Sequence, residues 1–119
     1  MSTALWAADC YKEATTQLEL NQCATAEYRL ADEELNQIYT RFRAALDNNH
    51  KKALTEVQRT WVKFRDLSCK FELSNGTGGS AEPMAYSICL TKRTRARTQE
   101  FKDMANCEEG DITCAPWKY

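Results

Sequence analysis

Six cysteines constrain what this chain can fold into more than any other feature of its sequence. They form an even set without a Cys-x-x-Cys motif, so zinc-ribbon spacing and thioredoxin-like chemistry are both unsupported. His50 is the only histidine, and a Cys/His metal site is therefore not expected. We expect disulfides in the sequential pairing, because each pair then flanks a candidate loop or helix junction: Cys10–Cys23, Cys69–Cys89 and Cys107–Cys114.

Disulfides also predict the compartment, because they persist only where the surroundings are oxidising. We expect a periplasmic or secreted protein. Residues 1–10 carry neither the basic nor the apolar part of a signal peptide, so we expect a mature form from which that peptide has been removed. No apolar run approaches the roughly 18 residues that a membrane span requires. The chain has 119 residues, which predicts a single domain, and a net charge of −1, which gives no strong attraction to nucleic acid.

The stretch TEVQRTWVKFRDLSC, residues 55–69, predicts the central helix of the fold. Side chains at spacings of three and four predict its buried face: Leu54, Val57, Trp61, Phe64 and Ser68. No Gly or Pro interrupts the chain between Leu46 and Asn75, so the helix is expected from about Lys51 to Phe71.

Trp61, Arg65 and Asp66 lie within this helix and read as residues of packing and orientation. Trp61 and Arg65 are four residues apart, so the guanidinium is expected to lie over the indole ring. A binding role for the three is the alternative.

A first long helix is predicted after Thr16, because Thr16 and Glu19 match a capping box. Its buried stripe is predicted as Leu20, Ala24, Glu27 or Tyr28, Ala31, Leu35, Ile38, Phe42 and Ala45; only Glu27 interrupts it, and Tyr28 can serve in its place. The polar residues 47–50 are expected to break the helix, with Asn in the left-handed conformation.

Pro83 suits the first turn of a third helix, from about Glu82 to Met104. Its apolar face is patchier: Ala85, Ile88, Cys89, Ala96, Phe101 and Met104. Residues 1–15 are expected to be irregular or a single turn, and residues 105–119 a disulfide-closed tail that folds Trp117 and Tyr119 back onto the bundle. No strand-like alternation is present, so the sequence predicts an all-α bundle, with two long antiparallel helices and the third packed across them.

Two surface features are candidate binding elements. One is a glycine-rich loop, which lacks the GxxxxGK[ST] spacing of a phosphate cradle: Gly76, Thr77, Gly78, Gly79 and Ser80. The other is a run of three carboxylates that fan around the first helix and so cannot line one cleft: Asp32, Glu33 and Glu34. No nucleophile with a base, no tuned acid and no metal set is evident, so neither catalytic residues nor a cofactor are expected.

The charges are unevenly distributed along the chain. Acidic residues dominate positions 1–40, basic residues dominate 41–70, and Lys92, Arg93, Arg95 and Arg97 add a cluster on the third helix. Neutralisation between neighbouring helices is the simpler interpretation. Alternatively, the acidic part meets a cationic partner, or the cluster meets an anionic glycan or lipid head group. Aromatic residues are not interleaved with the cluster, which disfavours single-stranded nucleic acid.

Four segments resemble a family of small secreted bacterial domains. Residues 31–39, ADEELNQIY, are similar to its AD-x-x-LN-x-x-Y run, and residues 61–69, WVKFRDLSC, to its W-x-x-aromatic-RD-x-x-C signature. Residues 19–23 resemble its first block, with Leu20 where Met is more usual. The family's third block is similar to a set of residues in this chain: Gly78, Gly79, Ser80, Cys89, Leu90, Thr94 and Arg97. The family is the lysozyme inhibitor LprI-like group, and the resemblance covers about residues 10–100.

This resemblance implies a helical, disulfide-containing binding module that blocks the cleft of a lysozyme or another secreted hydrolase. The loop from Gly76 to Ser80 is the expected plug, and Asp32, Glu33 and Glu34 are expected to steer the encounter. An envelope-stress protein or an immunity protein that binds another secreted or envelope protein is the alternative. The sequence leaves the oligomeric state open.

Overall fold

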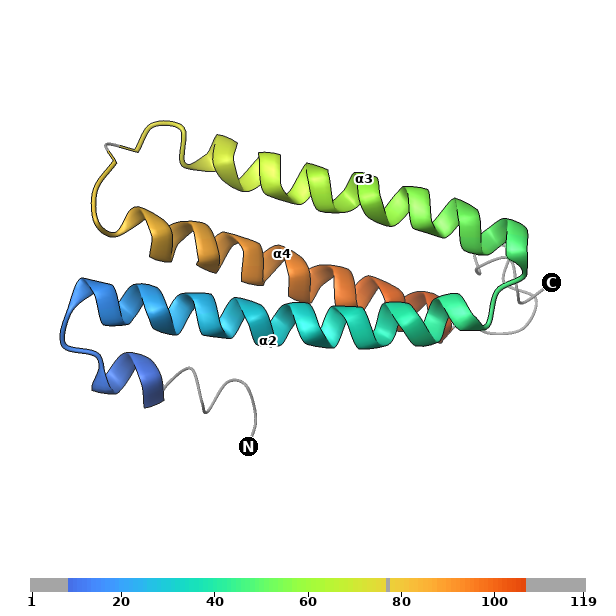
Figure 1. Ribbon diagram of the computed structural model, residues 1–119, viewed down its shortest axis with the longest axis horizontal. Helices are drawn as coiled ribbons and strands as arrows, with labels where there is room; N and C mark the ends of the chain where they lie inside the picture. The colour runs from blue at the N-terminus through green and yellow to red at the C-terminus, as the bar shows by residue number, and fades with distance from the viewer. Residues whose placement is uncertain (1–8, 77, 107–119) are drawn as a thin grey trace.

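A computed structural model describes residues 9–76 and 78–106 and shows three long helices (Figure 1). They are α2 (Gln17–Ala44), α3 (Asn48–Glu72) and α4 (Glu82–Ala105). A short helical segment, residues 9–13, precedes them, and no strand occurs in the part of the chain that the structure describes. The all-α prediction is confirmed. Within these residues no helix combines the length and the apolar character that crossing a bilayer would need.

Helix α2 begins where the capping box predicted. Thr16 is the N-cap, and its hydroxyl accepts a hydrogen bond from the backbone N–H of Glu19 at 3.1 Å. The Glu19 carboxylate reaches back to the N–H of Thr15 at 3.3 Å instead of that of Thr16. The backbone N–H groups of Thr15 and Glu19 are thereby both satisfied, in a version of the capping box that is shifted by one residue.

Helix α3 begins three residues before the predicted start. Asp47 is its N-cap, with the carboxylate accepting from the His50 N–H at 2.9 Å. The expected left-handed Asn was wrong, because no residue other than Gly has a positive φ among the described residues. A carboxylate at the N-cap satisfies the free N–H groups of the first turn, so Asn48 and Asn49 join the helix.

The close helix pair is α2 with α4, which run parallel, while α3 runs antiparallel to both (Figure 1). The predicted antiparallel arrangement of the first two long helices is present in α2 and α3, but the third helix, expected to pack across them, lies along α2 instead (Figure 1). Small buried side chains explain the choice, because they let two backbones approach: Ala24, Ala31, Ser87, Thr91, Thr94 and Thr98. The predicted apolar face of α4 was correspondingly wrong at Ile88 and Ala96, which are exposed.

Aromatic side chains close the core at the end of the bundle where α2 turns into α3. Phe101 is fully buried, and its ring centre lies 5.2 Å from that of Phe42 and 5.9 Å from that of Tyr39. Leu35 and Leu46 complete this cluster. Tilted ring pairs at these distances are favourable geometries, so packing of aromatic side chains stabilises this end.

The predicted face of α3 was only half right. Leu54, Trp61 and Ser68 are half-buried, but Val57 and Phe64 are 53% and 61% exposed. The buried side of the helix carries Arg65 and Cys69 instead. An arginine at a core position was not anticipated because its charge reads as a surface signal.

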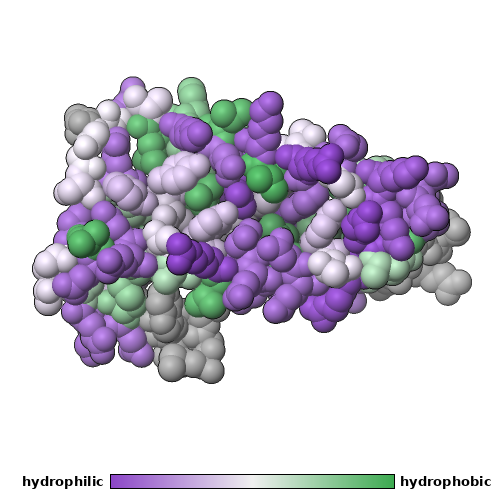
Figure 2. All heavy atoms as spheres, in the orientation of Figure 1, coloured by the Kyte–Doolittle hydropathy of each residue, from purple (hydrophilic) through white to green (hydrophobic). Residues whose placement is uncertain are grey.

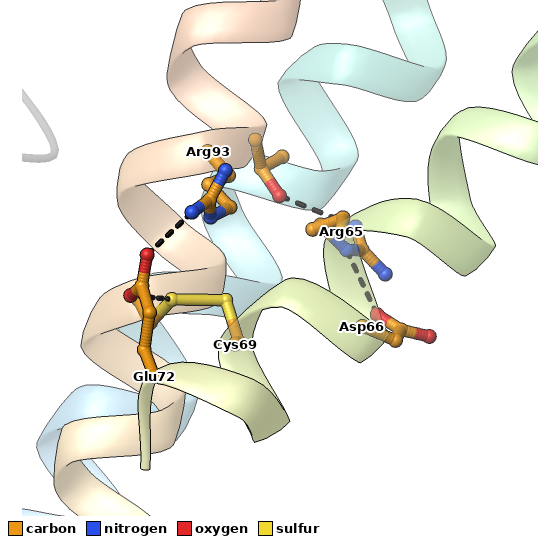
Figure 3. Close-up of a disulfide and its surroundings, with 7 residues drawn as sticks. Arg65, Asp66, Cys69, Glu72 and Arg93 are labelled. Carbon is orange, nitrogen blue, oxygen red and sulfur yellow. Dashed lines mark hydrogen bonds and ion pairs between the residues drawn. A yellow bond between two sulfur atoms is a disulfide. The ribbon is translucent and has the colours of Figure 1, made fainter. Parts of the chain in front are cut away.

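The disulfides Cys10–Cys23 and Cys69–Cys89 are both present, each with a Cα–Cα distance of 5.8 Å. Two of the three predicted pairs are therefore confirmed, and Cys107–Cys114 lies outside the described residues, as does the rest of the predicted tail beyond residue 106. The first bond ties the N-terminal turn to α2 and the second ties α3 to α4 (Figure 3). Both bonds lie at the end opposite the aromatic cluster.

Candidate functional site

A stack of alternating aromatic rings and guanidinium groups fills the space between α3 and the α2–α4 pair. The Arg65 guanidinium carbon lies 5.4 Å from the centre of the Tyr28 ring and 5.3 Å from that of Trp61. Arg97 continues the stack, at 5.6 Å from Trp61 and 4.5 Å from Phe101. Helix α3, on the far side of these long side chains, lies less close to α2 and α4 than these two helices lie to each other.

Arg65 is 6% exposed, and its charge is compensated on several sides. Its Nε donates to Asp66 at 3.0 Å and one terminal nitrogen donates to Thr94 at 3.2 Å (Figure 3). The Asp32 carboxylate lies 3.9 Å away. Burial raises the pKa of Tyr28, and the positive charge of Arg65 opposes that shift. Since a buried charge needs such partners, these contacts account for the buried position of Arg65.

Sequence reasoning anticipated the Trp61–Arg65 contact but missed Tyr28 and Arg97 as members of the stack. The same signal was present for Arg97, because Arg97 and Phe101 are also four residues apart. The helical period placed Tyr28 on the stripe of the first helix, but nothing local shows that it contacts Arg65, which lies on another helix.

The three consecutive carboxylates occupy different surroundings on α2. Asp32 faces Arg65 across the helix interface, with 40% of its side chain exposed. Glu33 and Glu34 are exposed on the outer side of the helix. Glu33 borders an open hollow of about 540 Å³ with Asn36, Gln37, Thr40 and Arg41. As predicted from their spacing, the three carboxylates do not converge on one point.

The glycine-rich loop connects α3 to α4 at the disulfide-bonded end. Gly76, Gly78, Gly79 and Ser80 are exposed, and Thr77 is outside the described residues. Gly78 has φ = 74°, which a side chain would disfavour. The Ser80 carbonyl accepts from the Asn21 side chain at 3.0 Å, so the loop is fastened to the start of α2. Asn21 and Glu33 are twelve residues apart on one helix, about 18 Å along its axis, so loop and carboxylates are not brought together.

An open hollow of about 450 Å³ lies beside this loop. It is lined by Lys70, Leu73, Gly78, Gly79, Glu82, Pro83 and Tyr86. It contains one basic and one acidic side chain and no histidine or cysteine, and residues 9–76 and 78–106 contain no cluster suited to a metal ion. The hollow offers shape and a few polar groups for contact with another molecule.

Most side chains of the basic cluster on the third helix form ion pairs or hydrogen bonds with other residues of the fold. Arg95 pairs with Glu27 of α2 at 3.0 Å, and Arg93 forms an ion pair with Glu72 of α3 (Figure 3). Arg97 donates to Gln58 at 3.1 Å and pairs with Glu100 at 2.7 Å. Ion pairs to neighbouring helices therefore account for Arg93 and Arg95, while Arg97 pairs within α4. Lys92 and Arg95 are the exposed members of the cluster.

The chain is similar in sequence to a known protein family and to bacterial proteins. A family model described as lysozyme inhibitor LprI matches residues 8–101, which include all but the last turn of the three helices. An uncharacterized protein of Rhizobium meliloti (strain 1021) is 39% identical over 114 residues, covering 85% of this chain and 81% of that protein. The uncharacterized protein YecT of Escherichia coli (strain K12) is 27% identical over 120 residues, covering 85% and 74%. No solved structure matches.

Proposed function

This chain belongs to the lysozyme inhibitor LprI family, and from that premise we propose that it is a secreted or periplasmic inhibitor that binds a lysozyme and blocks its cleft without catalysing a reaction. The observation that carries the proposal is the family match over residues 8–101. The two disulfides fit an oxidising compartment.

The loop from Gly76 to Ser80 is our proposed plug. Its described residues lie at one end of an elongated bundle, beside the start of α2, where they are accessible to a partner (Figure 1). Its base is fixed by the Cys69–Cys89 bond and by the Asn21–Ser80 hydrogen bond, which lowers the entropy lost when the loop binds. The hollow beside the loop gives the partner further surface to contact.

The acidic side of α2 is our proposed steering element. Lysozymes are commonly basic, and complementary potentials accelerate encounter more than they add affinity. Glu33 and Glu34 are exposed there, whereas Asp32 contributes less because it faces Arg65. Steering acts over about a Debye length, so these carboxylates do not need to touch the loop or the blocked cleft.

A cell-wall turbidity assay with micromolar protein tests the proposal. Chicken-type, goose-type and invertebrate-type lysozymes are each assayed with the oxidised full chain, and slower clearing is expected for at least one type. The loop is tested with Ser80→Lys, and Lys102→Ala at the far end of α4 is the matched control. Loss of inhibition in the loop variant alone supports the plug.

Full lytic activity of all three enzyme types at a large excess of the protein would remove the proposal. A pull-down from periplasmic extract then distinguishes the alternative, an envelope-stress or immunity-type protein that binds another secreted or envelope protein.

A further inference from the structure

The outward face of α3 carries a line of exposed apolar side chains that we call the apolar stripe. It consists of Val57, Phe64, Leu67 and Phe71, which are 53%, 61%, 54% and 77% exposed. Their spacings of seven, three and four residues place them on one side of the helix over about 21 Å. Single exposed apolar residues are ordinary, but an aligned set that includes two Phe marks a contact surface. Figure 2 shows hydrophobic side chains gathered among hydrophilic ones over α3.

A row of cations, the basic row, runs beside the apolar stripe. It consists of Lys52, Arg59, Lys63 and Lys70, all exposed and spaced at seven, four and seven residues. Glu56 lies among them and pairs with Arg59 at 3.5 Å, both side chains being about three-quarters exposed. Such a pair is weak in water, so the row keeps a net positive charge.

The sign of this charge selects the occupant of the face. In an antiparallel pair of copies, the side of the stripe that bears the basic row would face its own counterpart, placing like charges opposite one another. A basic lysozyme would be repelled for the same reason, so this face is distinct from the proposed inhibitory surface. An anionic surface satisfies both parts of the face at once. Apolar side chains enter the boundary between head groups and acyl chains, and flanking lysines reach the phosphates.

We propose that the outward face of α3 docks on an anionic lipid surface, with the apolar stripe inserted and the basic row on the lipid phosphates. The helix lies in the plane of the surface and does not cross it. The rest of the bundle remains on the aqueous side, where the glycine-rich loop stays accessible.

Flotation with vesicles tests this docking on the oxidised full chain. Vesicles with about one-third phosphatidylglycerol are compared with pure phosphatidylcholine. Binding is expected to the anionic vesicles only and to weaken as salt is raised. Phe64→Ser with Phe71→Ser is expected to lower the partition coefficient about tenfold or more. Lys63→Glu with Lys70→Glu is expected to abolish the preference for anionic lipid.

Matched controls separate this face from general stickiness and charge. Leu18→Ser with Ile88→Ser removes one exposed apolar side chain from α2 and one from α4. Leu18 is 66% exposed and Ile88 is 47% exposed. Lys92→Glu with Lys102→Glu makes the same charge change on α4. Both controls are expected to bind vesicles like the native chain, and melting curves by circular dichroism show that every variant is folded.

Three outcomes overturn the proposal. One is equal loss of vesicle binding in the control variants. Another is that the full chain does not bind anionic vesicles. The third is a dimer, seen by sedimentation, that is lost in the Phe64→Ser, Phe71→Ser variant while vesicles have no effect; this outcome would assign the face to a second copy.

Discussion

The guanidinium carbon of Arg65 lies 5.3 Å from the centre of the Trp61 ring, one helical turn earlier on α3. Tyr28 of α2 covers another side of the same group at 5.4 Å. A planar cation between two rings is held in place even though its interhelical ion pair, with Asp32, is long. The contact between α3 and the rest of the bundle therefore depends on the shape of arginine as much as on its charge.

Arg65→Lys is expected to lower the free energy of unfolding by about 1–3 kcal/mol, because an ammonium cannot stack on two rings and also hold Asp66 and Thr94. Urea unfolding followed by circular dichroism measures the change. Arg59→Lys, at an exposed position of the same helix, is the control and should change stability by less than about 0.5 kcal/mol. Equal effects at the two positions would contradict the role of the stack.

Removing the α3–α4 disulfide by Cys69→Ser with Cys89→Ser is expected to cost about 3 kcal/mol, from the chain entropy of a loop closed over 20 residues. Urea unfolding under non-reducing conditions gives the value.

Non-reducing peptide mapping of the same samples checks the third pair, and a peptide linking Cys107 to Cys114 is expected. Free thiols at these two positions would show that the sequential pairing ends with the second bond.

Ala31→Leu is expected to destabilise the fold by at least about 1–3 kcal/mol, because Ala31 has no exposed surface and lies in the close α2–α4 contact. Thermal melting measures the loss. Ala96→Leu adds the same atoms at an exposed site on α4 and should be nearly neutral. A neutral Ala31→Leu would mean that the two helices can separate without cost.

The N-cap of α3 predicts a pH dependence of stability. Hydrogen bonds from the His50 backbone and then its side chain lower the pKa of Asp47 from its ordinary value of 3.8. The ionised cap therefore stabilises the fold above that value, and its contribution is lost as the pH falls through the lower, folded-state pKa.

Asp47→Asn keeps a good N-cap but removes the charge. Its melting temperature should lie below that of the native chain at neutral pH, with the gap closing in acid. Glu56→Gln is the control, and a gap that is independent of pH would refute the role of the charge.

Charge reversal tests the steering carboxylates. Glu33→Lys with Glu34→Lys is expected to slow association with an inhibited lysozyme about tenfold at low salt and to change dissociation little. Stopped-flow fluorescence measures both rates. Glu56→Lys with Asp103→Lys makes the same change in net charge on α3 and α4, so an equal slowing there would point to net charge and not to the acidic side of α2.

The sequence predicted the number of long helices, the start of α2 and two disulfides, because each depends on local chemistry that a few neighbouring residues carry. Thr16 with Glu19 is such a signal, and so is the absence of Gly and Pro before Asn75. The buried faces were harder. Burial in α4 falls on Thr91, Thr94 and Thr98, whose hydroxyls read as polar while their size suits a close helix contact.

The candidate site was predicted less well for a related reason. Val57 and Phe64 read as core residues by periodicity, yet the helix turns them outward and buries Arg65. A hydrophobic period identifies an amphipathic helix but not which of two apolar directions meets the bundle. Only the placement of Tyr28 and Trp61 around Arg65 decides this, and that placement depends on residues far apart in the chain.

Both described disulfides lie at one end of the bundle, whereas among residues 9–76 and 78–106 the other end is closed without a covalent bond, by packing around Phe42 and Phe101 and by a hydrogen bond from Arg43 to Thr55. Thermal unfolding should therefore begin at the end where α2 meets α3 and proceed toward the end that the disulfides hold together. Amide protons would report this as a gradient of protection along each long helix. Under oxidising conditions the chain would then refold from the disulfide-bonded end, where the helices stay covalently linked in the unfolded state.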